Sequence, residues 1–184
     1  MIDHKLIAKY DKPLPRYTSY PPATSFHQGY GTEEFRGHVL ASNEQEPQGI
    51  SLYLHIPFCP RLCLYCGCNT LITRQDELIE RYLQALKKEI RMVAGWIDLS
   101  RPLTQIHWGG GTPNALSTEQ LGSLMALLNE PFRIQSSTEV AIECNPAHLD
   151  HDYLEALFQM GFNRISLGIQ DFNEEVLKTV HRDD

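Results

Sequence analysis

Residues 51–66 read SLYLHIPFCPRLCLYC, and this stretch decides the fold. Its first six residues, 51–56, are mostly apolar and predict a short buried strand. Cys59, Cys63 and Cys66 follow with the spacing C-x3-C-x2-C. Three thiols this close together need a loop to wrap around one centre. The stretch therefore predicts a strand that carries a cysteine-rich loop at its C-terminal end.

Downstream of this loop, strand and helix patterns alternate. Further strands are predicted at 105–108, 140–142 and 164–169. Apolar residues at helical spacing mark helices in 76–93, 121–128 and 153–158, and a fourth helix opens at 173–175. Ser117 and Gln120 form a capping-box pair before the second helix, and Gly161 is placed to end the third. The alternation predicts an α/β fold whose parallel strands are joined by right-handed crossovers, as an open sheet or part of a barrel.

The predicted strands end in residues suited to binding. The cysteines follow the first strand, Gly109 to Thr112 follow the second, Glu143 ends the third and Gln170 ends the fourth. In parallel α/β barrels the site lies at the C-terminal ends of the strands. We therefore expect these residues to converge on one rim.

Residues 1–49 are expected to form an N-terminal arm with a short helix near 33–40. The stretch PLPRYTSYPP at 13–22 cannot be helical, because proline fixes φ and removes backbone donors. Residues 50–184 are expected to hold the first four β/α units.

Composition narrows the function classes. The chain has 184 residues and a net charge of −7, from 16 basic and 23 acidic residues. This balance argues against a nucleic-acid partner. The sequence contains neither an apolar run of about 20 residues nor a secretory signal, so we expect no membrane partner and a cytoplasmic location. Four of the five cysteines lie within 59–68, which in a reducing compartment favours metal binding over disulfides.

The cysteine spacing suits an iron–sulfur cluster. Three thiolates can hold three irons of a [4Fe–4S] cube and leave the fourth open for a ligand. Cys68 then follows as a neighbouring thiol without a ligand role. The alternative is structural zinc with four cysteines, but such sites usually use two pairs separated by a dozen or more residues.

Several motifs together carry a family resemblance. Tyr65 stands just before the third cysteine, an arrangement that resembles the radical-SAM superfamily. PRYTSYPP at 15–22, SLYLHIPFC at 51–59, CGC at 66–68, HWGGGTP at 107–113 and SLGIQDFN at 166–173 resemble the oxygen-independent coproporphyrinogen III oxidases within it. The resemblance runs over nearly the whole chain and implies the first part of a radical-SAM, partial TIM-type barrel.

The resemblance implies cofactors and a reaction. Cys59, Cys63 and Cys66 would ligate the [4Fe–4S] cluster. Two S-adenosylmethionine molecules would bind at residues of the strand ends and loops. The first would contact Tyr53, Gly110 and Glu143, and the second Tyr65, Gly111, Thr112, Gln170 and Arg182. A 5′-deoxyadenosyl radical would drive oxidative decarboxylation of coproporphyrinogen III to protoporphyrinogen IX in haem biosynthesis, with an external electron donor such as flavodoxin or ferredoxin.

The same residues have other interpretations. The glycines could form only a tight strand-to-helix turn, Glu143 could pair with a lysine or arginine, and Tyr53 could be a core residue. Cys144 is expected to pack as a small buried hydrophobe. His55 and His107 are expected to be core histidines on their strands.

Two other functions remain open. A related radical-SAM haem chaperone shares the cysteine motif and the GGGTP turn, but is expected to lack the CGC extension and the PRYTSYPP arm. A non-catalytic metal-binding module is the other alternative. The chain is expected to lack the rest of the barrel and a C-terminal domain, and to be inactive alone.

Overall fold

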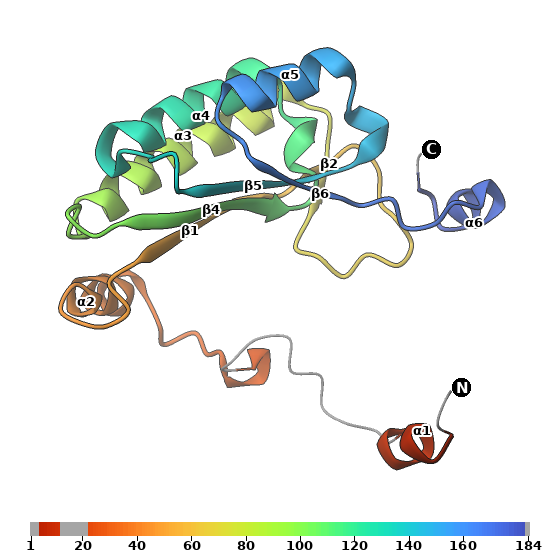
Figure 1. Cartoon of the computed structure of the whole chain (residues 1–184), viewed down its shortest axis with the longest axis horizontal. Coiled ribbons are helices and arrows are strands. Elements are labelled where there is room, and N and C mark those ends of the chain that lie inside the picture. The colour runs from red at the N-terminus through yellow and green to blue at the C-terminus, as the bar shows by residue number, and fades with distance from the viewer. Residues whose placement is uncertain (1–3, 12–21, 183–184) are drawn as a thin grey trace. The chain divides into compact units, whose positions relative to one another are not determined.

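The computed structural model describes residues 4–11 and 22–182 (Figure 1). The chain divides into two compact units, Met1–Phe35 and Arg36–Asp184. Helix α1 (His4–Tyr10) and a short 3₁₀ helix (Ala23–Ser25) lie in the first unit, and α2 is Thr32–Ser42. Helix α2 confirms the helix expected near 33–40, whereas α1 was not predicted. Most of the proline-rich stretch, 13–21, lies outside the described residues.

Four parallel strands form the main sheet of the second unit. They are β1 (Ile50–Ile56), β4 (Leu103–Gly110), β5 (Glu139–Cys144) and β6 (Arg164–Leu167), in the order β1-β4-β5-β6. Every neighbouring pair is parallel. The predicted parallel α/β fold is confirmed.

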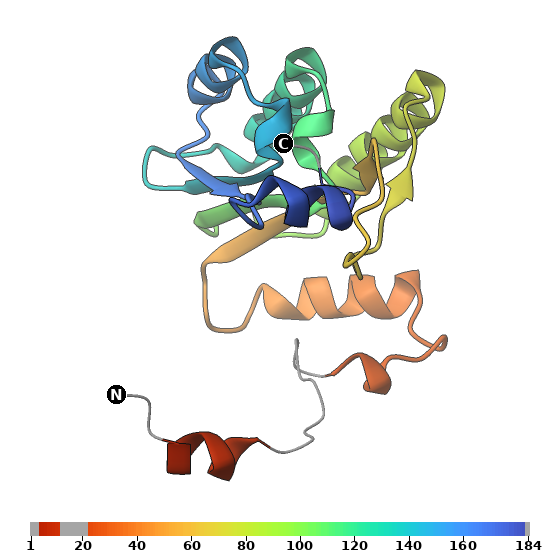
Figure 2. The ribbon, with the colours of Figure 1, turned by 90° about the vertical axis from the view of Figure 1, so that its right-hand side faces the viewer.

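Three helices make the crossovers between these strands. They are α3 (Asp76–Ala94), α4 (Thr118–Phe132) and α5 (His151–Gln159). All three lie side by side on one face of the sheet (Figures 1 and 2). The opposite face carries no crossover helix and is called the open face below. Helix α6 (Glu174–Thr179) follows β6.

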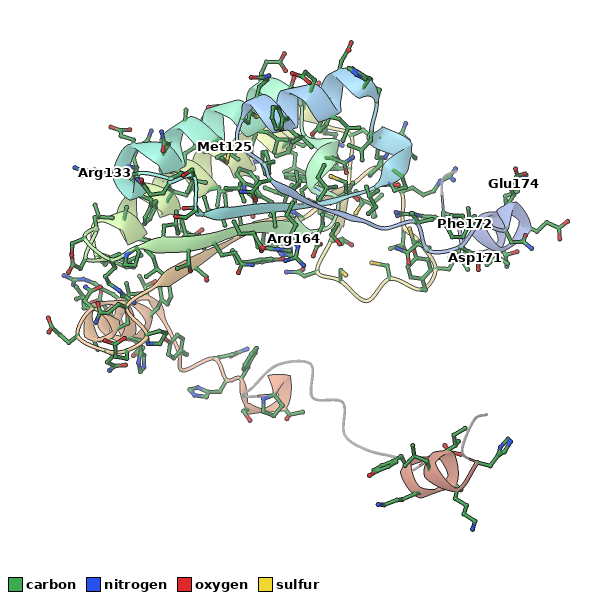
Figure 3. The ribbon with its side chains drawn as sticks, in the orientation of Figure 1. Met125, Arg133, Arg164, Asp171, Phe172 and Glu174 are labelled. Atoms are coloured by element: carbon green, nitrogen blue, oxygen red, sulfur yellow. The ribbon has the colours of Figure 1, made fainter. Side chains whose placement is uncertain are left out.

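The core lies between the sheet and these helices. Strand residues alternate between the two faces, so the apolar ones meet the helices. The largest fully buried side chains of this layer belong to Ile56, Leu83, Ile106, Trp108, Leu121, Leu124, Leu128, Val140, Ile142 and Leu157. The alternate positions present polar side chains on the open face, such as Arg164, which lies on the side of the sheet away from the helices (Figure 3). Its guanidinium pairs with Glu139 at 2.9 Å.

Local sequence signals correctly predicted several element ends. Ser117 Oγ accepts a hydrogen bond from the Gln120 amide at 3.3 Å, and the Gln120 side chain accepts one from the Ser117 amide at 2.9 Å, so the capping box is confirmed. Gly161, with φ +93°, follows the end of α5 as expected.

Other element ends differ from the prediction. Strand β4 continues through Gly109 and Gly110, and β6 stops at Leu167, two residues early. Helix α6 spans only Glu174–Thr179. A second, two-stranded parallel sheet, β2 (Phe58–Cys59) and β3 (Leu71–Ile72), was not predicted. Within the described part of the chain, none of the helices has the length and apolar character required to cross a membrane.

Candidate cofactor site

A cavity of about 220 Å³ lies at the C-terminal ends of the strands. Its wall holds every predicted site residue except Tyr53. These residues are Cys59, Cys63, Tyr65, Cys66, Gly110, Gly111, Thr112, Glu143, Gln170 and Arg182. Their assigned roles remain predictions, but their convergence on one rim is a feature of the fold.

The small β2–β3 sheet anchors the cysteine loop. The Leu71 amide donates to Pro57 O at 2.7 Å, and the Thr73 amide donates to Cys59 O at 3.0 Å. These bonds close the loop that carries Cys63 and Cys66 back onto its own start. The free thiol of Cys59 lies 3.3 Å from Thr112 Oγ1, which ties the loop to the turn after β4.

The surroundings of Cys59 shift the pKa of its thiol in both directions. Burial raises the pKa of the Cys59 thiol, and the thiols of Cys66 and Cys63 raise it further. The hydrogen bond from Thr112 and the charge of Arg182 act in the opposite direction. A metal centre would displace the thiol protons and offset the charge of the resulting thiolates.

The cysteines provide the donor type that an iron–sulfur cluster requires, since thiolates are its usual ligands. Cys59, Cys63 and Cys66 share the cavity wall. Within residues 4–11 and 22–182, no group of three or more His, Cys, Asp or Glu side chains is arranged to hold a metal ion.

The glycines after β4 allow two backbone segments to touch. The Gly111 amide donates to Ile56 O at 2.8 Å, and the Thr112 amide donates to Phe58 O at 2.9 Å. A Cβ on Gly111 would lie 2.7 Å from Pro57 O. Gly110 has φ +120°, a conformation that L side chains rarely adopt. The glycines therefore form a tight turn, and the same turn also borders the cavity.

Arg182 closes the other side of the cavity. Its Nη1 donates to Cys63 Sγ at 3.8 Å, and Nη2 donates to Gly168 O. Its Nε is buried and has no hydrogen-bond partner within the described residues. The Leu64 amide donates to Val180 O at 2.9 Å, which holds this segment against the cysteine loop. A buried donor without a partner suits an anionic ligand group in the cavity.

Tyr53 lies on the open face beside this cavity. Its side chain is exposed, so the core interpretation is wrong. Its hydroxyl lies 3.1 Å from His55 Nδ1, and His55 Nε2 lies 2.9 Å from Asn69 O. A carbonyl only accepts, so in the neutral imidazole Nε2 donates to Asn69 and Nδ1 accepts from Tyr53. Burial raises the pKa of Tyr53, and the Glu143 carboxylate adds to this, which keeps the hydroxyl a donor.

The two histidines are not core residues, contrary to expectation. Both side chains lie on the open face, and His107 Nε2 is 3.0 Å from Glu143 Oε1. Glu143 is thus paired with a histidine rather than with a lysine or arginine. Because strand residues alternate between faces, the spacing of Tyr53 and His55 was the signal that both share one face. Cys144, by contrast, packs in the core as expected.

The comparisons with known proteins agree with this geometry. Residues 53–184 match the family described as "Radical SAM superfamily". An oxygen-independent coproporphyrinogen III oxidase from Synechocystis sp. is 46% identical over 178 residues, which are 97% of this chain and 38% of the relative. The protein of that name from Escherichia coli K12 is 44% identical over 181 residues, 98% of this chain and 39% of the relative.

A solved structure is similar over the same region. It is titled "Coproporphyrinogen III oxidase (HemN) from Escherichia coli is a Radical SAM enzyme", and it matches with a TM-score of 0.84 and 42% identity. The match covers 98% of this chain and 39% of that chain, so our chain spans about two fifths of the length of these relatives. The family match covers the whole cavity wall, from the cysteine loop to Arg182. The chain belongs to the radical SAM superfamily.

Proposed function

We propose that this chain is the cofactor-binding part of an oxygen-independent coproporphyrinogen III oxidase. The observation that carries the proposal is the cavity at the strand ends, where three thiols meet the glycine turn, Glu143 and Arg182. The names of the similar proteins support the choice of coproporphyrinogen III as substrate. Protoporphyrinogen IX would be the product. The reaction would belong to haem biosynthesis.

Two cofactors would occupy this cavity. Cys59, Cys63 and Cys66 would hold a [4Fe–4S] cluster, and S-adenosylmethionine would bind at its open side. When bound, these groups supply the one-electron chemistry that removes a hydrogen from a propionate side chain before carbon dioxide leaves. A small electron carrier such as flavodoxin or ferredoxin would supply the electron.

The residues of the chain would bind and orient these groups. The Glu143 carboxylate can only accept hydrogen bonds, so it suits an amino or hydroxyl group of S-adenosylmethionine. Gly110 and Gly111 leave backbone accessible to a ligand. The buried Nε–H of Arg182, which has no partner within the described residues, could donate a hydrogen bond to the carboxylate of the ligand. Tyr53 would contact the same molecule as Glu143.

A second S-adenosylmethionine would use the other side of the cavity. Tyr65, Thr112, Gln170 and Arg182 are its proposed contacts, with Gly111. The lining of the cavity by all five supports this assignment. Equilibrium dialysis of the cluster-loaded protein would give two bound molecules per chain if both sites form.

Anaerobic reconstitution with iron and sulfide tests the cluster site. We expect a brown protein with about four irons per chain, because three thiolates can hold a four-iron cube. Cys59→Ala, Cys63→Ala and Cys66→Ala should each abolish the colour, since each removes one ligand. Iron and sulfide analysis with the visible absorption spectrum measures the outcome.

Cys68→Ala is the matched control in the same loop. Its thiol is exposed, and the variant should keep most of the iron. Equal loss in all four variants would reject the three-ligand assignment. Binding of one zinc per chain in place of iron would favour the metal-binding module.

A further inference from the structure

His107 contacts side chains of both strands next to its own. It lies in β4, where its Nε2 is 3.0 Å from Glu143 Oε1 on β5. Its ring stacks on that of Tyr53 on β1, with centroids 5.9 Å apart and planes 14° apart. A carboxylate is an acceptor, so His107 Nε2 carries the proton and donates it. The Tyr53 ring thus restrains His107 on one side, and His107 restrains the Glu143 carboxylate on the other.

Gly109 leaves room for the Glu143 carboxylate because it has no side chain. A Cβ on Gly109 would lie 3.1 Å from Glu143 Oε2 and 3.0 Å from Tyr53 Cε2. One carboxylate oxygen therefore takes the His107 hydrogen bond while the other lies over bare backbone. The Glu143 side chain is 47% exposed. Without His107 it would be free to change rotamer, and a ligand would then have to order this side chain on binding.

The same contacts reach the cysteine loop. Asn69 O accepts from His55, His55 accepts from the Tyr53 hydroxyl, and the Tyr53 ring stacks on His107. Side chains of β1 and β4 thus join the loop to Glu143 on β5. His107 itself does not line the cavity, whereas Glu143 does. Any effect of His107 on a ligand there must pass through Glu143 or Tyr53.

We propose that His107 is a positioning residue that holds the Glu143 carboxylate toward the cavity, where it accepts a hydrogen bond from S-adenosylmethionine. The inference rests on the proposed function, because it takes Glu143 as a contact of that ligand. It assigns His107 neither a metal nor a direct ligand contact. Its effect is to reduce the freedom of Glu143 before the ligand arrives.

Two substitutions separate the hydrogen bond from the ring stacking. His107→Phe keeps a ring against Tyr53 but has no donor for Glu143. His107→Gln loses the ring but places an amide donor near the position of Nε2. With the cluster loaded, we expect H107F to raise the Kd for S-adenosylmethionine about tenfold, which corresponds to about 1.4 kcal/mol. H107Q should stay close to the unsubstituted protein.

Coupling to Glu143 distinguishes positioning from a general structural role. In the Glu143→Ala background, H107F should raise the Kd no further, because the group that His107 holds is absent. Gln105→Leu is the matched control, since Gln105 lies two residues earlier on β4 and donates to Glu139 Oε1 at 2.7 Å. Q105L removes an equivalent hydrogen bond on the open face and should leave the Kd unchanged.

The outcomes separate this inference from the proposed function. If the unsubstituted, cluster-loaded protein does not bind S-adenosylmethionine, the proposed function fails. If it binds and H107F binds equally well, or if H107F and E143A weaken binding additively, the positioning role is overturned. Should H107F fail to load the cluster, H107Q is compared with His107→Asn, whose amide is one methylene too short to reach Glu143. Equal affinities of those two variants would also overturn it.

Discussion

At the scale of single residues, Cys144 shows how burial sets the state of a side chain. Cys144 ends β5 and is only 4% exposed. Burial raises the pKa of its thiol from 9.0 to about 12, and the neighbouring Glu143 carboxylate contributes to the shift. In the unfolded chain the thiol ionises at its ordinary value. The folded pKa is the higher one, so the buried, neutral thiol contributes to the stability of the fold below pH 9. This contribution is lost as the pH rises from 9 toward 12.

We therefore predict that Cys144→Ala changes the pH dependence of stability. The free energy of unfolding of the reduced, cluster-free protein should fall less steeply between about pH 9 and 12 in the variant, because the thiol whose pKa is raised in the fold is absent. At pH 7 the variant should be less stable by about 1 kcal/mol, from lost packing. Urea unfolding at several pH values measures both effects. Parallel pH curves for the two proteins would contradict the prediction.

Residue placement was predictable from sequence where the residues are close along the chain. Cys59, Cys63 and Cys66 share one cavity wall, as their close spacing predicted. His107 was missed because its partner Glu143 lies 36 residues away, on the next strand. Only the register that pairs His107 with Tyr53 and with Ala141 shows which side chains meet. A single strand pattern does not contain that register.

At the scale of elements, the end of β4 depends on close backbone contact. Gly111 lies where a Cβ would be 2.7 Å from Pro57 O and 2.8 Å from Phe58 O. Both obstacles are backbone atoms, so a side chain there must displace the β1–β2 connection or the turn. That turn delivers Thr112 to Cys59. The geometry of the cysteine loop therefore depends on the absence of a side chain at one position.

Gly111→Ala should consequently weaken both the fold and the cluster site. We expect a loss of about 1–3 kcal/mol, the usual range for overpacking, and a lower iron content after reconstitution. Gly67→Ala is the matched control, because nothing lies within 4 Å of a Cβ built on Gly67 in the same loop region. Thermal unfolding followed by circular dichroism measures the stability of both variants. A G111A protein as stable as G67A would show that the contact relaxes at no cost.

The long elements were predictable because their apolar periodicity is strong. Strand β1 and helix α3 appear within one residue of their predicted ends. The elements that were missed have no such pattern. Strands β2 and β3 contain two residues each, too few for alternation, and α1 has seven residues, none of them buried. Hydrogen bonds between the two segments, not local preference, determine β2 and β3.

At the scale of the whole molecule, the sheet is open along β6. This strand pairs with β5, and the order of the sheet gives its other edge no partner strand within the described residues. Ile165 and Leu167 on β6 and the following Ile169 are exposed apolar side chains. An unpaired edge with apolar side chains is a site for association. The cavity lies at the C-terminal end of this same sheet.

We therefore predict that the 184-residue chain binds the cluster but forms no protoporphyrinogen from coproporphyrinogen III. The cysteine loop, the glycine turn and Glu143 lie together in the unit Arg36–Asp184, so cluster loading and slow cleavage of S-adenosylmethionine are expected. Product formation also needs an enclosed site, because radical chemistry requires that water be excluded. The test is anaerobic turnover with reductant and S-adenosylmethionine, with the full-length Escherichia coli relative as the positive control. Product formed by this chain at a rate near that of the control would show that the enclosure beyond β6 is not required.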